Sequence, residues 1–142
     1  MAINLKLQFE KNLLAIISLA VAIVALSYNS WRNELSEDNR NIREAGFEVM
    51  REAAKLQAYI DTKTYTDKDN SDEAIAGWVS INLIVSLSEL ISVDIQSEAI
   101  NLKTVWTENW SGLNEDKAAN QKITQANNQL VSAVRTHLAR LK

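Results

Sequence analysis

The residues best suited to chemistry are acidic side chains that recur at helical spacing. Glu44, Glu48 and Glu52 follow one another every four residues, so they would share one helix face, where carboxylates can coordinate a metal ion. Arg51 and Lys55 each follow one of these carboxylates by three residues, a spacing typical of ion pairs on a solvated helix surface. The chain also lacks the Glu-x-x-His pairs of di-iron bundles. We therefore predict a charged surface here and no metal site.

Other catalytic constellations are missing from the sequence. The chain has no cysteine and a single histidine, His137, so it offers neither a thiolate nucleophile nor a histidine metal cluster. Its three glycines, Gly46, Gly77 and Gly112, are isolated and cannot form a phosphate-binding loop. The formal net charge of −3 provides no basic footprint for nucleic acid. We expect no enzyme, no cofactor and no nucleic-acid partner.

The tryptophans and one asparagine are the remaining candidates for a binding site. Trp106 and Trp110 lie one helical turn apart, and they are either large core residues or an exposed ridge that anchors a partner. Asn82 interrupts a helix that is apolar nearly all round, and it either fixes helix register or contacts a neighbouring helix. A pocket near Trp78, Asn82 and Trp106 would make the chain a sensor of small ligands.

Helices must position all of these residues, because the chain has no proline and only three glycines. The first helix carries a hydrophobic segment at residues 13–26 that contains no charge. With its aromatic flanks it extends over residues 9–31, about 23 residues, which is enough to span a hydrocarbon core of about 30 Å. The side chains predicted to face lipid are Leu13, Leu14, Ile16, Ile17, Leu19, Val21, Ile23, Val24 and Leu26.

Two other interpretations of this segment bear on where the chain resides. A signal peptide would have Lys6 and Lys11 in its basic region and a cleavage site at residues 25–27. A buried core helix would usually show a polar stripe, which this segment lacks. Helical patterning continues unbroken through Tyr28 and Trp31, which favours an uncleaved anchor. Basic residues are balanced on its two sides. The short basic N-terminal tail then favours a bacterial inner-membrane protein with an exported C-terminal domain.

From residue 31 onward the first helix has the heptad rhythm of a coiled coil. Apolar residues recur every seven positions at Leu35, Ile42, Val49 and Leu56, and a second series lies at Gly46, Ala53 and Ile60. Gly46 and Ala53 are small enough for another helix to approach closely, either from the same bundle or from a second copy of the chain. Ile42, Gly46, Val49, Ala53 and Leu56 are therefore candidate interface residues, together with the tryptophan pair.

Three further helices follow a polar loop at residues 64–72. The four helices of the bundle are predicted at about 31–62, 73–91, 97–111 and 115–141. Gly112 is expected to end the third in a left-handed conformation, and Asn114 to cap the fourth. Amide side chains along the fourth helix indicate a face in contact with water; they are Asn120, Gln121, Gln125, Asn127, Asn128 and Gln129.

The sequence thus predicts an all-α protein in which a tail and single transmembrane helix at 1–30 continue into an antiparallel bundle of about four helices at 31–142. Residues 74–91 are predicted to form either a bundle core helix or a second membrane segment, because the sequence has no charged residue from Ala74 to Ser88. We expect a membrane-bound interaction protein (an accessory subunit, scaffold or tether) whose partners are the lipid bilayer and a protein or a second copy. A membrane-anchored ligand sensor and a secreted bundle are the alternatives.

Overall fold

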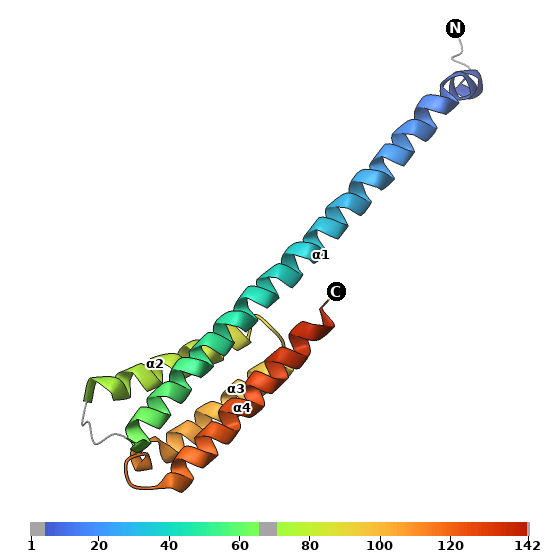
Figure 1. Cartoon of the computed structure of the whole chain (residues 1–142). Coiled ribbons are helices and arrows are strands. Elements are labelled where there is room, and N and C mark those ends of the chain that lie inside the picture. The colour runs from blue at the N-terminus through green and yellow to red at the C-terminus, as the bar shows by residue number, and fades with distance from the viewer. Residues whose placement is uncertain (1–4, 66–70, 142) are drawn as a thin grey trace. The chain divides into compact units, whose positions relative to one another are not determined.

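The computed structural model describes residues 5–65 and 71–141, and the side chains of residues 12–65 and 75–141. All regular secondary structure in these ranges is helical, which confirms the predicted all-α fold (Figure 1). The elements are α1 (Leu5–Tyr65), α2 (Ser71–Ser88), α3 (Val93–Asn109) and α4 (Lys117–Arg140), with a short 3-10 helix, η1 (Trp110–Gly112), before α4.

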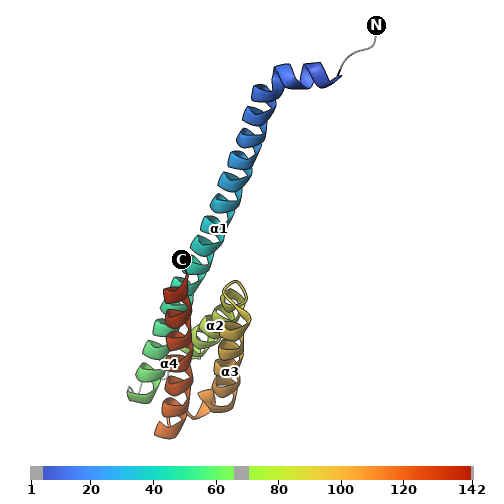
Figure 2. The same ribbon diagram turned by 90° about the vertical axis from the view of Figure 1, so that its right-hand side faces the viewer.

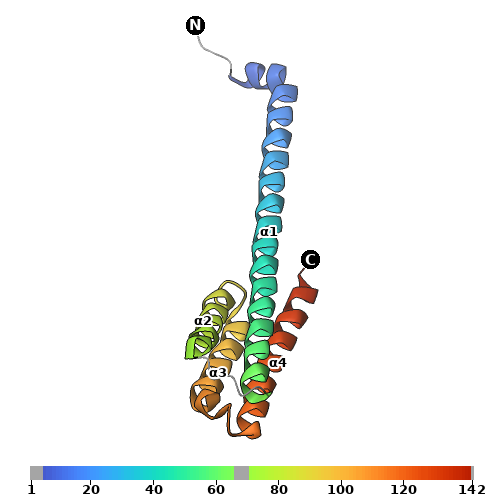
Figure 3. The ribbon, with the colours of Figure 1, turned by 60° about the vertical axis from the view of Figure 1, so that its left-hand side comes forward.

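The chain divides after Asp38 into two compact units, and α1 contributes to both. In the second unit, the C-terminal part of α1 packs with α2, α3 and α4 as an up-and-down antiparallel bundle, seen from two further sides in Figures 2 and 3. Residues 31–38, which the sequence pattern assigned to the bundle, fall in the first unit. Their side chains are all exposed, so they add nothing to the bundle core.

The bundle encloses one apolar core to which α1, α2, α3 and α4 all contribute. The core residues of each helix recur mostly at three- and four-residue steps, so they share one face and are buried against the other helices. The largest fully buried side chains are Val49, Leu56, Ile60, Ile81, Ile84, Ile95, Leu102, Trp106, Leu113, Ile123, Leu130 and Val134.

Two helix starts differ from the prediction because other residues cap them. α3 begins at Val93 rather than 97, since the Ser92 hydroxyl oxygen accepts a hydrogen bond from the backbone nitrogen of Ile95 at 3.3 Å. α4 begins at Lys117, and its cap is Asp116 instead of Asn114. The Asp116 Oδ1 accepts a hydrogen bond from the backbone nitrogen of Ala118 at 2.7 Å, and a carboxylate at this end also suits the helix dipole.

The helix ends also differ from the prediction. Gly112 is not left-handed, since no described glycine has a positive φ; it lies in η1, whose tight turn ends the run of α3. α1 continues to Tyr65, beyond the predicted end at 62, while α2 stops at Ser88 rather than 91. Ser88 donates its hydroxyl to the carbonyl oxygen of Val85 at 2.6 Å where α2 ends. The rest of the predicted loop, residues 66–70, lies outside the described residues.

Candidate functional site

The apolar segment of α1 is exposed along its whole length. Among the described residues, α1 is the one helix long and apolar enough to cross a membrane, with a mean hydropathy of 2.1 over 18 residues, none of them buried. All nine side chains predicted to face lipid are exposed, from 40% at Ile16 to 79% at Leu14. These are the properties of a single membrane span, and also those of a signal sequence near an N-terminus.

An aromatic pair lies at the C-terminal side of this segment. The ring centroids of Tyr28 and Trp31 are 6.2 Å apart, and both side chains are about 60% exposed, at 60% and 58%. Tyrosine and tryptophan are enriched where a transmembrane helix leaves the hydrocarbon, because each combines an apolar ring with a polar tip. The pair therefore occupies the place expected for an interfacial belt.

The stretch 74–91, which the sequence left open as a second membrane segment, contributes to the bundle. Ile81 and Ile84 of α2 are fully buried in the core. The Ser80 hydroxyl donates a hydrogen bond to a carboxylate oxygen of Glu52 in α1 at 2.9 Å. The uncharged run Ile75–Ser88 is also shorter than a membrane span needs.

The candidate interface along α1 packs inside the bundle. Val49, Ala53 and Leu56 are at most 1% exposed, and Ile42 packs against the same core from its edge. Gly46 is buried against Leu138 of α4. A Cβ atom added there would lie 2.9 Å from Cδ2 of Leu138. The sequence allowed either a helix of the same bundle or a helix of a second copy to pack against Gly46. In the structure, the helix at Gly46 is α4 of the same chain.

Trp106 and Trp110 belong to an aromatic cluster within the bundle instead of an exposed ridge. Trp106 is fully buried, and its ring centroid lies 5.7 Å from that of Tyr59 and 6.0 Å from that of Trp78. Trp110 is half-buried and meets Trp78 edge-on at 6.1 Å. Gly77 admits this packing, because an added Cβ would lie only 2.6 Å from two carbons of the Trp106 indole.

The three residues predicted to line a ligand pocket, Trp78, Asn82 and Trp106, differ in how exposed they are. Trp106 is packed into the core beside Trp78, whereas Asn82 is exposed on α2. The Oδ1 atom of Asn82 accepts a hydrogen bond from Nζ of Lys103 in α3 at 3.1 Å. Asn82 therefore contacts a neighbouring helix, which was one of its two expected roles.

Two amides of α4 were predicted to face water, and that prediction is wrong. Asn120 and Asn127 are 8% and 3% exposed and point towards α1. Asn127 donates through Nδ2 to the carbonyl oxygen of Ala53 at 2.9 Å, and Asn120 donates to Oγ1 of Thr64 at 3.0 Å. Polar side chains can be buried when such partners are available. Gln121, Gln125, Asn128 and Gln129 are exposed as expected.

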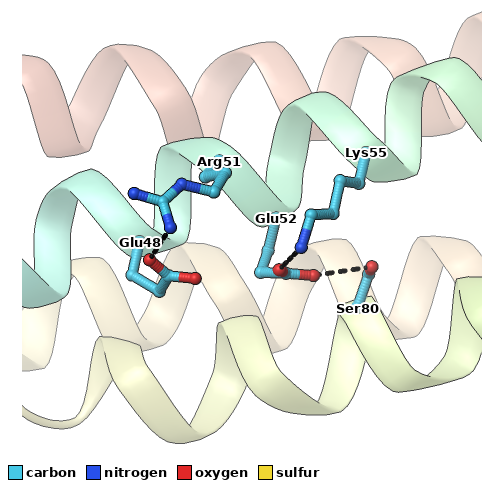
Figure 4. A network of polar contacts seen from close by, with 5 residues as sticks. All are labelled: Glu48, Arg51, Glu52, Lys55 and Ser80. Carbon is cyan, nitrogen blue, oxygen red and sulfur yellow. Dashed lines mark hydrogen bonds and ion pairs between the residues drawn. The ribbon is translucent and has the colours of Figure 1, made fainter.

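Two of the three carboxylates singled out on α1, Glu48 and Glu52, make separate ion pairs (Figure 4). Glu48 pairs with Arg51 at 2.9 Å, and the buried Glu52 accepts a hydrogen bond from Nζ of Lys55 at 2.5 Å. The described residues contain no group of three acidic or histidine side chains placed to hold a metal ion. The Lys55 hydrogen bond lowers the pKa of Glu52 below its ordinary value of 4.5. Burial opposes this shift, while Ser80 and the charges of Lys55 and Arg51 support it.

Because the Glu52 pKa is lower in the folded protein than in the unfolded chain, ionised Glu52 stabilises the fold. This contribution is complete above about pH 5.5, roughly one unit above the ordinary value, and is lost as the pH falls through the folded pKa. We expect Glu52→Gln to be less stable than the natural protein at pH 7 and to show a shallower loss of stability in acid. Thermal unfolding between pH 7 and pH 3 measures both effects.

The matched control for this prediction is Glu48→Gln, which removes the same charge one turn away. Its side chain is 34% exposed against 5% for Glu52, so water screens its ion pair and the change in stability should be small. Equal pH profiles for the natural protein and Glu52→Gln would contradict the prediction.

One exposed feature of the bundle was not identified from the sequence. Five residues of α2 and the turn after it are exposed at alternating steps of three and four; we call them the α2 stripe, and they are Ala76, Val79, Leu83, Ser86 and Leu90. α2 is apolar nearly all round, so its hydrophobic pattern could not tell a covered face from an open one. The spacing of the stripe residues at steps of three and four is the sequence signal that could have indicated a second apolar face on α2.

His137 lies half-buried on α4, beside an open groove between α3 and α4 with a volume of about 580 Å³. Asp94 and Glu98 line the groove from α3, and Arg140 lines it from α4.

No family model matches this chain, and comparison with curated proteins and with solved structures likewise finds no match.

Proposed function

We propose that this chain is a single-pass membrane protein whose helical bundle is an interaction module, acting without catalysis as an accessory subunit, scaffold or tether. The observation that carries the proposal is the open apolar segment of α1. None of the 18 residues in its most hydrophobic window is buried. Nine Leu, Ile and Val residues together favour insertion by about 3–5 kcal/mol.

The proposal places the bundle in the aqueous phase next to a bacterial inner membrane, on the exported side. Lys6 and Lys11 precede the apolar segment, and short basic tails before a first hydrophobic helix usually remain in the cytoplasm. An interaction role is supported by the α2 stripe, because the bundle leaves this apolar face uncovered.

The test is fractionation of the full chain. We expect it to stay in the membrane pellet after a carbonate wash with its N-terminus intact. A mature N-terminus near Tyr28 would instead indicate a cleaved signal peptide and a secreted bundle. The double variant Leu19→Arg, Ile23→Arg should leave the pellet, because two arginines at the helix centre cost about 5–7 kcal/mol in total, more than the segment gains.

Leu35→Arg is the matched control for this experiment. Leu35 is also an exposed apolar residue of α1, at 46%, but it lies outside the predicted span. We therefore expect this variant to remain in the membrane pellet. Release of the control and of the double variant alike would argue against a membrane span at residues 13–26.

A further inference from the structure

The α2 stripe is an open face on a helix whose other side forms the core. Ser80, Ile81 and Ile84 are buried, whereas Val79 is 57% and Leu83 is 37% exposed. The stripe continues past the end of α2 to Leu90, which is 65% exposed, and Ile75 lies at its start with 65%. Large apolar side chains thus follow the length of α2 on a side that no other described helix covers.

The charge around the stripe limits what can cover it. The exposed side chains of α2 from Ile75 to Ser88 carry no charge. Lys103 donates a hydrogen bond to Asn82 beside the stripe, while Glu89 and Asp94 lie close to its C-terminal end in the sequence. An anionic lipid surface attracts basic clusters and repels acidic groups such as these. An identical uncharged face, by contrast, meets the stripe without opposing like charges along its length.

The spacing of the stripe suits a second helix. Steps of three and four residues place Ala76, Val79, Leu83 and Ser86 in a heptad seam. Its two small residues let a partner helix come close, and its two larger ones can fill the gaps opposite. We propose that the α2 stripes of two copies of this chain pack against each other, forming a homodimer.

The dimer depends on membrane anchoring, so this inference rests on the proposed function. Four partly exposed apolar side chains, Ile75, Val79, Leu83 and Leu90, offer roughly 130–270 Å² of apolar surface per copy, by the usual relation between area and transfer energy. Stable soluble complexes bury about 800 Å² per partner. Two copies held in one bilayer meet at a high effective concentration, which allows a smaller interface to suffice.

Disulfide crosslinking tests the dimer, because the natural chain has no cysteine and an introduced one is the sole reactive thiol. The full chain is reconstituted in lipid vesicles with a single substitution: Val79→Cys, Leu83→Cys or Ser86→Cys. Mild oxidation should give a several-fold higher yield of dimer at the stripe than at Gln125→Cys and Asn128→Cys. These two controls lie on the exposed face of α4 and are held in the same bilayer. Equal yields at both places would overturn the proposal.

A second variant separates specific pairing from collisions. Val79→Glu would set two carboxylates against each other, so we expect it to abolish the Ser86→Cys crosslink, whereas Gln125→Glu should leave that crosslink intact. Circular dichroism checks that both variants fold. A stripe cysteine that stays monomeric and is protected by lipid from a water-soluble maleimide would overturn the proposal in favour of membrane contact. A stripe cysteine that crosslinks to a different protein in native membranes, but forms no crosslink in vesicles, would also overturn the proposal.

The outcomes also separate this inference from the proposed function. A chain that carbonate releases from the membrane contradicts the anchor, whatever its crosslinks. A chain that stays in the membrane without crosslinks at the stripe contradicts the homodimer and leaves the anchor standing.

Discussion

Replacing Trp106 with alanine is expected to lower the free energy of unfolding of the bundle by about 3–5 kcal/mol. The side chain is fully buried, and the rings of Tyr59 and Trp78 lie against it at centroid distances of 5.7 and 6.0 Å. Alanine would lose the transfer energy of the indole and leave a cavity between α1, α2 and α3. Because a domain of this kind has only about 5–15 kcal/mol of total stability, the variant should be close to unfolding.

Chemical denaturation of the full chain in a mild detergent, followed by circular dichroism, measures this loss. Trp110→Ala is the matched control, because Trp110 is half-buried and shares the neighbour Trp78 at 6.1 Å. We expect it to lose clearly less stability. No described residue accepts a hydrogen bond from Nε1 of Trp106, so Trp106→Phe removes an unpaired donor and should fall between the two. Equal losses at both tryptophans would contradict the assigned packing.

The helices and the core of the bundle could be predicted because their signals are periodic. In α1, Val49, Ala53 and Leu56 lie on the heptad seam, and the same residues are buried in the structure. A seven-residue apolar repeat indicates which face of a helix is covered, but not how far the cover extends: Leu35 belongs to the same repeat and is 46% exposed. The repeat does not identify which helix covers that face. The structure shows that α4 covers it at Gly46, where the Leu138 side chain lies against the glycine.

Features that depend on one partner across the bundle could not be predicted. Asn127 was expected to face water, since an amide beside other amides on one helix usually does. Its burial depends on the carbonyl oxygen of Ala53, which is 74 residues away in the sequence. The cap of α4 was misplaced for a related reason: Asn114 and Asp116 are both good N-caps, and only the local backbone conformation selects Asp116.

The α2 stripe marks a different limit. α2 is apolar nearly all round, so its pattern alone indicates burial on every side. A membrane span, a central bundle helix and a helix with one open face all satisfy that pattern. Once Ile81 and Ile84 are seen to face the core, the exposure of Val79 and Leu83 follows from the helical repeat.

The second large effect is expected at the two glycines, Gly77 and Gly46, where an added Cβ atom would meet a side chain of another helix at less than 3.0 Å. A Cβ atom at Gly77 would lie 2.6 Å from two indole carbons of Trp106 and 3.2 Å from Cε1 of Tyr59. A Cβ atom at Gly46 would lie 2.9 Å from Cδ2 of Leu138. The neighbours differ in how far they can yield. Trp106 is a rigid ring that is fully buried, whereas the Leu138 methyl group is the end of a flexible side chain near the end of α4.

We therefore expect Gly77→Leu to lower the free energy of unfolding by about 3 kcal/mol, the upper end of overpacking costs, and Gly46→Leu by about 1–2 kcal/mol. Alanine at either site gains about 0.8–1 kcal/mol of helix propensity, which should nearly offset the strain at Gly46 but not at Gly77. Denaturation measures the four variants, and crosslinking through Ser86→Cys reports their association. Because Gly46 faces the chain's own α4, Gly46→Leu should lose stability and keep its dimer. A stable Gly46→Leu variant that no longer pairs would instead place the second copy against α1.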